Sequence, residues 1–309
     1  MSSRSKRSGR SSENDSIPFE GEHSLGALAI VDLFSQSFQR ILDSPDLPEF
    51  IQVVKGSLYE RQFLEAFDDD NKRFAYAARW TPARSLAYAS LFSSLEPVKG
   101  LFEDPDSTTS VLCVGGGAGG ELVGLASVFC RLKEHNSTST SNLVVKIVDI
   151  ADWSAIVTNV TKYMQQNWLY KPEKLTTQFI HKDILGNGFS AYGDLDLITL
   201  MFTTNELFSE KRAETIRFLQ TLNRSCKQGA HLLIAESAGS YSHITVGTKK
   251  FPVQFIIDTV LLGKQGEDTG AWDLVDQSDS CWYRIDEKEV DYPMKLENMR
   301  FFYRLYEKK

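Results

Sequence analysis

The sequence has few cysteines, none of them closely paired, and it has no long apolar run. Four cysteines occur among its 309 residues: Cys113, Cys130, Cys226 and Cys281. Without a CxxC pair, and with histidines that show no ligand spacing, a metal site is not expected. Scattered thiols are typical of a reducing intracellular compartment, and residues 1–12 lack the apolar stretch of a secretory signal. Apolar runs such as Leu195–Phe202 are far too short to span a bilayer, so no membrane segment is expected.

An excess of positive charge is also missing. The formal net charge is -7, which argues against binding of naked nucleic acid by bulk charge, because such binding neutralises phosphates with Lys and Arg. An RNA-modifying enzyme with a local basic patch stays compatible with this charge. The first ten residues include four basic side chains: Arg4, Lys6, Arg7 and Arg10. We predict that the Ser-rich residues 1–22 form a disordered tail, with a nuclear-targeting or RNA-contacting arm as the alternative.

The part that follows shows helical periodicity. Apolar residues recur at three- and four-residue steps over residues 28–42 and again over residues 50–67, which predicts two amphipathic helices. The acidic run Asp68–Asp70 is expected to be a loop. A third helix is expected to begin near Thr81-Pro82, with the proline in its first turn. Residues 23–104 are therefore predicted to form an all-helical N-terminal extension.

From residue 105 the pattern changes to strands that alternate with helices. Such alternation predicts parallel strands joined by helical crossovers, an α/β sheet within residues 105–309. The expected strands are Val111–Val114, Leu143–Val148, Thr176–His181, Leu195–Met201 and His231–Ala235, and the expected helices are Glu121–Lys133, Trp153–Trp168 and Lys211–Arg224. Two further strands, Ser280–Ile285 and Arg300–Tyr306, have no helix between them and predict an antiparallel pair at the sheet edge.

The strongest local signal is a strand that leads into a glycine-rich turn and then a helix. Glycine permits positive φ and lets a ligand lie against bare backbone, and amides at a helix N-terminus favour a negatively charged group. The glycines fit two kinds of loop. Gly115, Gly117 and Gly119 make GxGxG, the S-adenosylmethionine (SAM) type. Gly115, Gly117 and Gly120 make GxGxxG, the dinucleotide type.

Three further features favour SAM. The next strand ends in Asp149, whose carboxylate can accept both ribose hydroxyls, although NAD has the same need. The third strand ends in Asp183 followed by aliphatic residues, a set that suits an adenine amine and ring. The C-terminal antiparallel pair matches the Rossmann-like sheet of class I SAM methyltransferases. Either acid can instead be a turn or capping residue, and an NAD-dependent oxidoreductase stays the alternative.

Two segments carry a narrower resemblance. The loop of residues 113–122 and the upstream segment of residues 79–88, which begins Arg-Trp-Thr-Pro, resemble the fungal large-subunit ribosomal RNA uridine-N3 methyltransferases. The resemblance covers residues 24–306 and implies SAM as cofactor, a uridine in ribosomal RNA as target and a nuclear or nucleolar location, with the cytoplasm as an alternative. The net charge of -7 departs from what a ribosomal RNA binder leads us to expect. It favours recognition within a pre-ribosomal particle, by a chain that we expect to be a monomer.

Candidate catalytic residues follow the fourth strand, where SAM enzymes of this fold hold the methyl acceptor. This strand ends at Met201, which is expected beside the cofactor. If uridine N3 is the acceptor, its proton must leave, and Glu206 is the candidate general base. Asn205 can hydrogen-bond a uracil carbonyl, and Phe202 can stack on the base. Positioning can supply much of the catalysis, and Glu206 or Asn205 can instead be a surface or turn residue.

The segment before the glycine loop combines cations with aromatic rings. Tyr76, Arg79, Arg84 and Tyr88 can bind the SAM carboxylate or an unpaired base, although rings at helical spacing are often core. Two cations among apolar neighbours require an anion. The same cofactor loop also serves protein or small-molecule methyltransferases and non-catalytic SAM-binding assembly factors, so the acceptor site has to decide among these functions.

Overall fold

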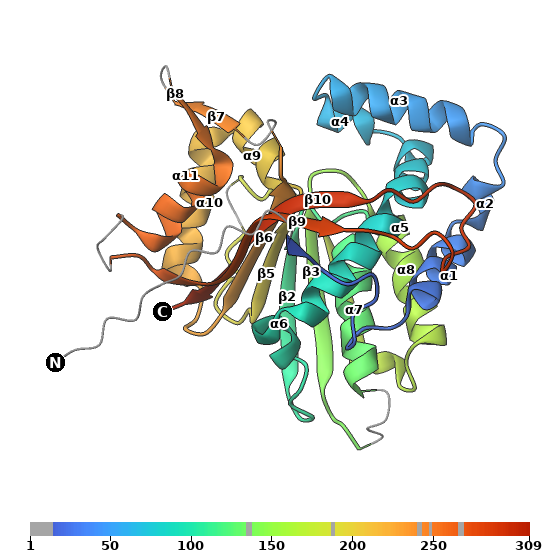
Figure 1. The fold of residues 1–309 in the computed structure, drawn as a ribbon, viewed down its shortest axis with the longest axis horizontal. Coiled ribbons are helices and arrows are strands. Elements are labelled where there is room, and N and C mark those ends of the chain that lie inside the picture. The colour runs from blue at the N-terminus through green and yellow to red at the C-terminus, as the bar shows by residue number, and fades with distance from the viewer. Residues whose placement is uncertain (1–14, 134–137, 187–188, 240–242, 247–248, 265–268) are drawn as a thin grey trace.

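Five adjacent parallel strands form one side of an eight-stranded sheet in the computed structural model (Figure 1). The structure describes residues 15–133, 138–186, 189–239, 243–246, 249–264 and 269–309. They are β2 (Thr108–Val114), β3 (Asn142–Asp149), β4 (Leu175–His181), β5 (Leu197–Met201) and β6 (His231–Ser237). The full order is β1-β9-β10-β6-β5-β2-β3-β4. Strand β10 (Met299–Lys308) runs antiparallel to both β6 and β9 (Trp272–Tyr283). The predicted Rossmann-like α/β sheet with an antiparallel C-terminal pair is confirmed.

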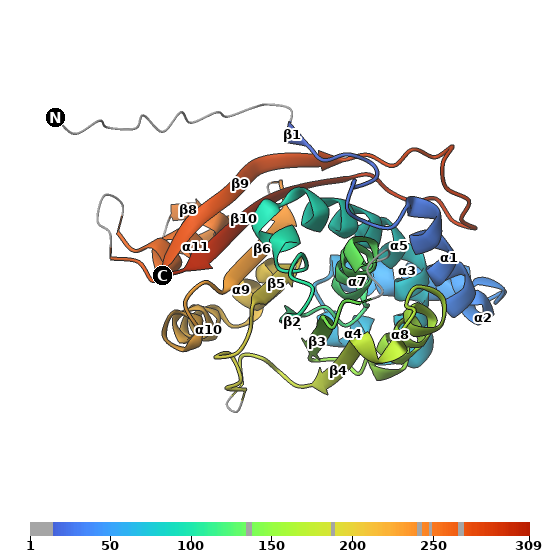
Figure 2. The ribbon, with the colours of Figure 1, turned by 90° about the horizontal axis from the view of Figure 1, so that it is seen from below.

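Alternate residues of the central strands enter two separate hydrophobic cores. On β2, Val111 and Cys113 belong to one cluster and Leu112 to the other, as expected for a strand that is covered on both faces. The first face carries α5 (Asp70–Ser94), α7 (Gly120–Lys133) and α8 (Ser154–Asn167), and the second carries α10 (Arg212–Ser225) and α11 (Val253–Leu262) (Figure 2). Within the described ranges, no helix is both long enough and apolar enough to cross a membrane.

Helices of the N-terminal extension pack on the first face and share its core. They are α1 (Ala27–Ser37), α2 (Gln39–Leu42), α3 (Leu47–Tyr59), α4 (Phe63–Ala66), α5 and α6 (Glu96–Gly100). Helices α5 and α7 approach closely, since a Cβ on Gly124 would lie only 3.0 Å from Tyr88 Cβ and 3.1 Å from the backbone nitrogen of Ala89. The predicted boundary near residue 104 stays a prediction about chain organisation, because both parts contribute to one core.

Helix α5 begins eleven residues earlier than the prediction of a start at Thr81-Pro82. Its N-cap is Asp69, whose carboxylate accepts the backbone N–H of Asn71 at 2.8 Å, so the acidic run starts the helix rather than forming only a loop. Pro82 lies inside the helix and cannot donate to the carbonyl of Ala78. The hydroxyl of Tyr292 donates to that carbonyl at 2.6 Å instead, and this tertiary contact explains why the proline is tolerated.

Replacing Tyr292 by phenylalanine is expected to lower the free energy of unfolding by about 1–2 kcal/mol, because the buried Ala78 carbonyl loses its remaining donor. The measurement is chemical denaturation followed by circular dichroism. Tyr170→Phe is the matched control, since that side chain is 90% exposed and its loss of a hydroxyl should change nothing. Equal stability of the two variants would contradict this account of Pro82.

The helix predicted over residues 50–67 is broken in two. Helix α3 ends at Tyr59 and α4 begins at Phe63, with Arg61 between them at a φ of 59°. A non-glycine residue in this left-handed region stops an α-helix. Outside the predicted elements, the structure adds α9 (Thr204–Glu210), a 3₁₀ turn at Pro172–Lys174 and a separate two-stranded ribbon of β7 (His243–Val246) and β8 (Lys249–Pro252).

The predicted disordered tail of residues 1–22 is wrong for its last eight residues. Strand β1 (Asp15–Ser16) pairs in parallel with the edge strand β9, and the hydroxyl of Tyr283 donates to the carbonyl of Phe19 at 3.0 Å. The free edge of β9 offers unpaired backbone groups, and this short strand satisfies some of them. Residues 1–14, with the four basic side chains, lie outside the described residues.

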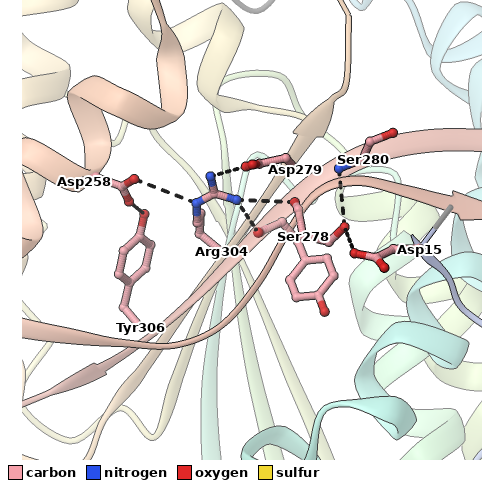
Figure 3. Close-up of polar contacts among 8 residues, drawn as sticks. Asp15, Asp258, Ser278, Asp279, Ser280, Arg304 and Tyr306 are labelled. Carbon is pink, nitrogen blue, oxygen red and sulfur yellow. Dashed lines mark hydrogen bonds and ion pairs between the residues drawn. The ribbon is translucent and has the colours of Figure 1, made fainter. Parts of the chain in front are cut away.

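A buried arginine joins the C-terminal strands to α11 (Figure 3). Arg304 on β10 is 5% exposed and its guanidinium binds the carboxylate of Asp279 and, at 3.8 Å, that of Asp258 on α11. The hydroxyl of Tyr306 donates to the same Asp258 at 2.7 Å. A buried cation is tolerated only with such partners, so this cluster has a structural role.

Candidate active site

A cavity opens at the carboxyl ends of β2, β3 and β5, where the strand order reverses between β2 and β5. Open α/β sheets bind their ligands at this position. The cavity measures about 1110 Å³, counting the part that is open to solvent. Most of the site residues proposed from the sequence line it: Tyr76, Arg84, Tyr88, Gly115, Asp149, Asp183, Met201, Phe202 and Glu206. The structure therefore brings residues of the helical extension and of the sheet to one place.

The glycine loop needs its glycines for different reasons. Gly115 has a φ of 71° and Gly119 a φ of 84°, conformations that other residues rarely adopt. A Cβ on Gly115 would also overlap the side chain of Thr203. Gly117 is different, because the space beside it is filled by the indole of Trp153, which a Cβ would overlap. Gly117 therefore makes room for a side chain of the protein, whereas we expected it to expose backbone to a ligand.

Asp149 is held by the loop that it faces. Its carboxylate accepts the backbone N–H of Gly117 at 3.0 Å and that of Ala151 at 3.1 Å. Burial raises the pKa of Asp149, and these hydrogen bonds offset part of the effect. Since each carboxylate oxygen can accept more than one hydrogen bond, the group stays able to accept hydroxyls of a ligand in the cavity.

Asp183 lies on the same wall of the cavity and is paired within the protein. Lys211 donates to its carboxylate at 2.6 Å, and the backbone N–H of Leu185 donates at 2.9 Å. Burial acts to raise the pKa of Asp183, but these donors outweigh it and hold the pKa below its usual value. The carboxylate is therefore charged at neutral pH, and both of its oxygens can only accept hydrogen bonds.

An aromatic cluster covers the glycine loop, and it joins the predicted Tyr76 to two rings that the sequence analysis did not single out as site residues. Phe67, Tyr76 and Trp153 come from three different segments, and their rings lie 4.9 to 5.8 Å apart. All three line the cavity. Such rings provide flat apolar walls against which a planar heterocycle can stack.

The two arginines that the sequence analysis singled out, Arg79 and Arg84, lie in different places, and one of them lines the cavity. Arg84 faces the cavity, donates to the hydroxyl of Tyr76 and lies 5.6 Å above the ring of Phe202. Arg79 lies outside the cavity, where its guanidinium donates to the carbonyl of Lys295 at 3.0 Å and to the carboxylate of Glu297 at 2.6 Å. The anion that Arg79 was expected to require is therefore a carboxylate of the chain itself.

Phe202 follows β5 directly and has a φ of 61°. This left-handed conformation is strained for a phenylalanine, and such strain gathers at functional sites. The backbone N–H of Phe202 donates to the carbonyl of Ala235 at 2.8 Å, which holds the conformation. Its ring lies 6.4 Å from that of Tyr88 and 6.1 Å from that of Phe301. In this conformation the ring of Phe202 lies among the aromatic side chains at the cavity.

Glu206 and its neighbour Glu236 form an acidic pair on this side. Burial, followed by the charges of Asp149 and Glu236, raises the pKa of Glu206 to about 8. Glu236, at the end of β6, accepts the backbone N–H of Asn205 at 3.1 Å and the hydroxyl of Thr204 at 3.2 Å. It thereby anchors the first turn of α9, which carries Glu206. Asn205 itself does not line the cavity, so its expected role in binding the base stays a prediction.

Glu121 is a second carboxyl group that the sequence analysis did not single out. It is 4% exposed, lines the cavity beneath Gly116 and accepts the hydroxyl of Thr199 at 3.4 Å. Burial raises the pKa of Glu121 to about 8. The sequence did hold a signal for this residue: Glu121 follows Gly120 directly and lies in the first turn of α7, a helix whose first eleven residues are buried.

Comparison with known proteins identifies the family. A family model described as a SAM-dependent methyltransferase matches residues 34–307. The chain belongs to this family. This SAM-dependent methyltransferase is 46% identical over 323 aligned residues to the 25S rRNA (uridine(2843)-N(3))-methyltransferase of Saccharomyces cerevisiae, covering 94% of this chain and 88% of that protein. Membership decides between the two interpretations of the loop: the GxGxG interpretation applies, and the methyl donor is SAM.

Two solved structures show a weak similarity to this chain. The N-methyltransferase NodS from Bradyrhizobium japonicum WM9, in complex with S-adenosyl-L-homocysteine, is 14% identical with a TM-score of 0.39, over 89% of this chain and 98% of that chain. TrmN from Thermus thermophilus is 14% identical with a TM-score of 0.40, over 74% of this chain and 53% of that chain.

The cavity's residues fit SAM. Asp149 offers a carboxylate for ribose hydroxyls, Asp183 offers one for the adenine amine, and Ile150, Ile184 and Leu185 provide an apolar wall for the ring. Bound SAM supplies a methyl group that its sulfonium activates for transfer. Arg84, Phe202 and Glu206 line the same cavity, and their part in binding a methyl acceptor stays a prediction.

Proposed function

We propose that this methyltransferase transfers the methyl group to N3 of a uridine in large-subunit ribosomal RNA. The observation that carries the proposal is the 46% identity, over 94% of the chain, to the yeast 25S rRNA (uridine(2843)-N(3))-methyltransferase. The shared length includes the helical extension as well as the cofactor domain. The parts of the chain that would bind the acceptor are thus included in the likeness.

The acceptor side of the cavity suits this chemistry. N3 of uracil carries a proton that must leave for the nitrogen to attack a methyl group, and Glu206, with its pKa raised to about 8, accepts it. Arg84 offsets the negative charge that develops on the ring, and its guanidinium lies over Phe202. Phe202 and Tyr88 offer ring faces for stacking, so the uridine has to be unpaired or flipped out of a helix.

The partner and location follow from the same proposal. A chain with a net charge of -7 is poorly suited to hold naked ribosomal RNA by charge alone. We propose that it acts as a monomer on RNA presented by a pre-ribosomal particle in the nucleus, at the nucleolus where that particle forms. Sedimentation of the chain with pre-ribosomal fractions tests this part separately.

The test is to map N3-methyluridine in large-subunit ribosomal RNA from cells that lack the chain. Loss of one modified uridine is expected, with return on expression of the chain but not of an Asp149→Ala variant. An unchanged modification pattern would overturn the proposal. If ribosome assembly fails without the chain and the inactive variant restores it, the chain is instead an assembly factor.

A further inference from the structure

An indole and two guanidinium groups lie together on the surface at the end of the β9–β10 pair. The guanidinium carbon of Arg284 lies 4.6 Å from the ring centre of Trp282, and that of Arg300 lies 5.7 Å from it. Both arginines are exposed and Trp282 is half-buried. The Nε of Arg300 also donates to the hydroxyl of Ser280 at 2.8 Å. These contacts order both cations without neutralising them, and we call the group the arginine–tryptophan surface.

Neither arginine is paired with an acid within the part of the chain that the structure describes. Among the residues that the structure describes, no carboxylate forms an ion pair with Arg284 or Arg300, although Asp286 and Glu287 follow closely in the chain. Arg304 lies four residues further along β10 and differs from both, because it is buried and paired with two carboxylates (Figure 3). In a chain with a net charge of -7, a pair of ordered and uncompensated arginines points to an anionic partner.

The arginine–tryptophan surface lies at the same edge of the sheet as the active-site cavity. The end of β9 and the beginning of β10 lie beside the end of β6. The carbonyl of Arg300 accepts the backbone N–H of Ala238, which follows β6 directly. The neighbouring Phe301 contacts Phe202 of the cavity on the opposite face of β10. Trp282 on β9 lies three strand spacings from β5 and three residues along the strands from the level of Met201, a distance of roughly 17 Å, and Arg300 on β10 is one strand spacing nearer. A few nucleotides of single-stranded RNA cover this distance.

We propose that Trp282, Arg284 and Arg300 bind the phosphates and bases of single-stranded RNA next to the nucleotide held in the cavity. Guanidinium groups bind phosphate oxygens through paired N–H donors and stack on nucleobases. Contact with Trp282 orders the two arginines beforehand, which lowers the entropy cost of binding. The proposal rests on the proposed function only in that the substrate is RNA, and it does not depend on which nucleotide is methylated.

The test compares two double variants of the full chain with equal net charge. Arg284→Gln/Arg300→Gln removes the arginine–tryptophan surface, and Arg217→Gln/Arg224→Gln removes two exposed arginines of α10 as the matched control. Binding of a fluorescent oligouridylate of about 20 nucleotides is measured by anisotropy at several salt concentrations, with S-adenosyl-L-homocysteine present. Each lost phosphate contact lowers the slope of log binding constant against log salt concentration by about 0.7 for a single strand. The first variant loses two contacts, so its slope should be about 1.4 shallower and its binding roughly 25-fold weaker at 0.1 M salt.

Affinity for S-adenosyl-L-homocysteine should be equal in all of these proteins, because none of the replaced residues lines the cavity. That result shows that the variants are folded. Equal RNA affinity of the two double variants would overturn the proposal, and so would a lack of RNA binding by the unchanged chain. Either failure is distinct from failure of the proposed function, which is measured by N3-methyluridine in cellular ribosomal RNA.

Discussion

Glu206→Gln is expected to lower kcat for methyl transfer by about 10²–10⁴-fold, the usual contribution of a general base. Glutamine keeps the size of the side chain but cannot accept the proton from uracil N3. Affinity for S-adenosyl-L-homocysteine should be retained, since Glu206 lines the cavity and we propose that it contacts the methyl acceptor rather than the cofactor. The measurement is single-turnover transfer to pre-ribosomal particles isolated from cells that lack the chain. Glu214→Gln, on the exposed side of α10, is the control and should transfer at the normal rate.

The pH dependence provides a second measure of the same role. A base works in its ionised form, and burial together with the charges of Asp149 and Glu236 raises the pKa of Glu206 to about 8. The rate should therefore rise as pH increases from 6 toward 8 and level off above it, with roughly one-tenth of the group ionised at pH 7. The Glu206→Gln variant should lose this rise. A normal rate in the variant, or a rise that persists in it, would show that positioning alone drives the reaction.

Gly117→Ala is expected to weaken binding of S-adenosyl-L-homocysteine by about 1–3 kcal/mol, the cost of overpacking a filled site. The added methyl overlaps the indole of Trp153, which must move into the cavity or against Phe67 and Tyr76. Calorimetric titration measures the effect, with NAD as the ligand that should not bind. Gly56→Ala on α3 is the control, because nothing lies within 4 Å of its added methyl.

A double variant separates this cause from direct contact with the ligand. If Trp153 mediates the effect, adding Gly117→Ala to a Trp153→Ala chain should cost less affinity than adding it to the unchanged chain. Equal costs in the two backgrounds would mean that the methyl blocks the ligand itself. That outcome would restore our original expectation, in which the bare backbone of Gly117 contacts the cofactor.

Local sequence patterns predicted the elements whose signal lies within a few residues. The strand and glycine run that ends in Gly115–Gly120, and the acids that follow the next two strands, all mark a parallel sheet with a cofactor loop. These signals are local because glycine is needed for backbone conformation, and because strands covered on both faces are apolar throughout. The start of α5 was misplaced for the opposite reason. Tyr292 compensates Pro82 from more than 200 positions away.

The sequence by itself determined that the chain builds a Rossmann-like sheet with a glycine-rich cofactor loop, and that Asp149, Asp183 and Glu206 follow the strands at the edge where ligands bind; it favoured SAM over NAD, and family membership decided between them. Only the tertiary structure decided that Trp153 fills the space beside Gly117, that Glu297 neutralises Arg79, and that Glu236 anchors the turn that carries Glu206. Each of these contacts joins segments that are far apart in the chain. Their partners are selected by packing and by the need to satisfy buried charges and amides, which no local spacing records.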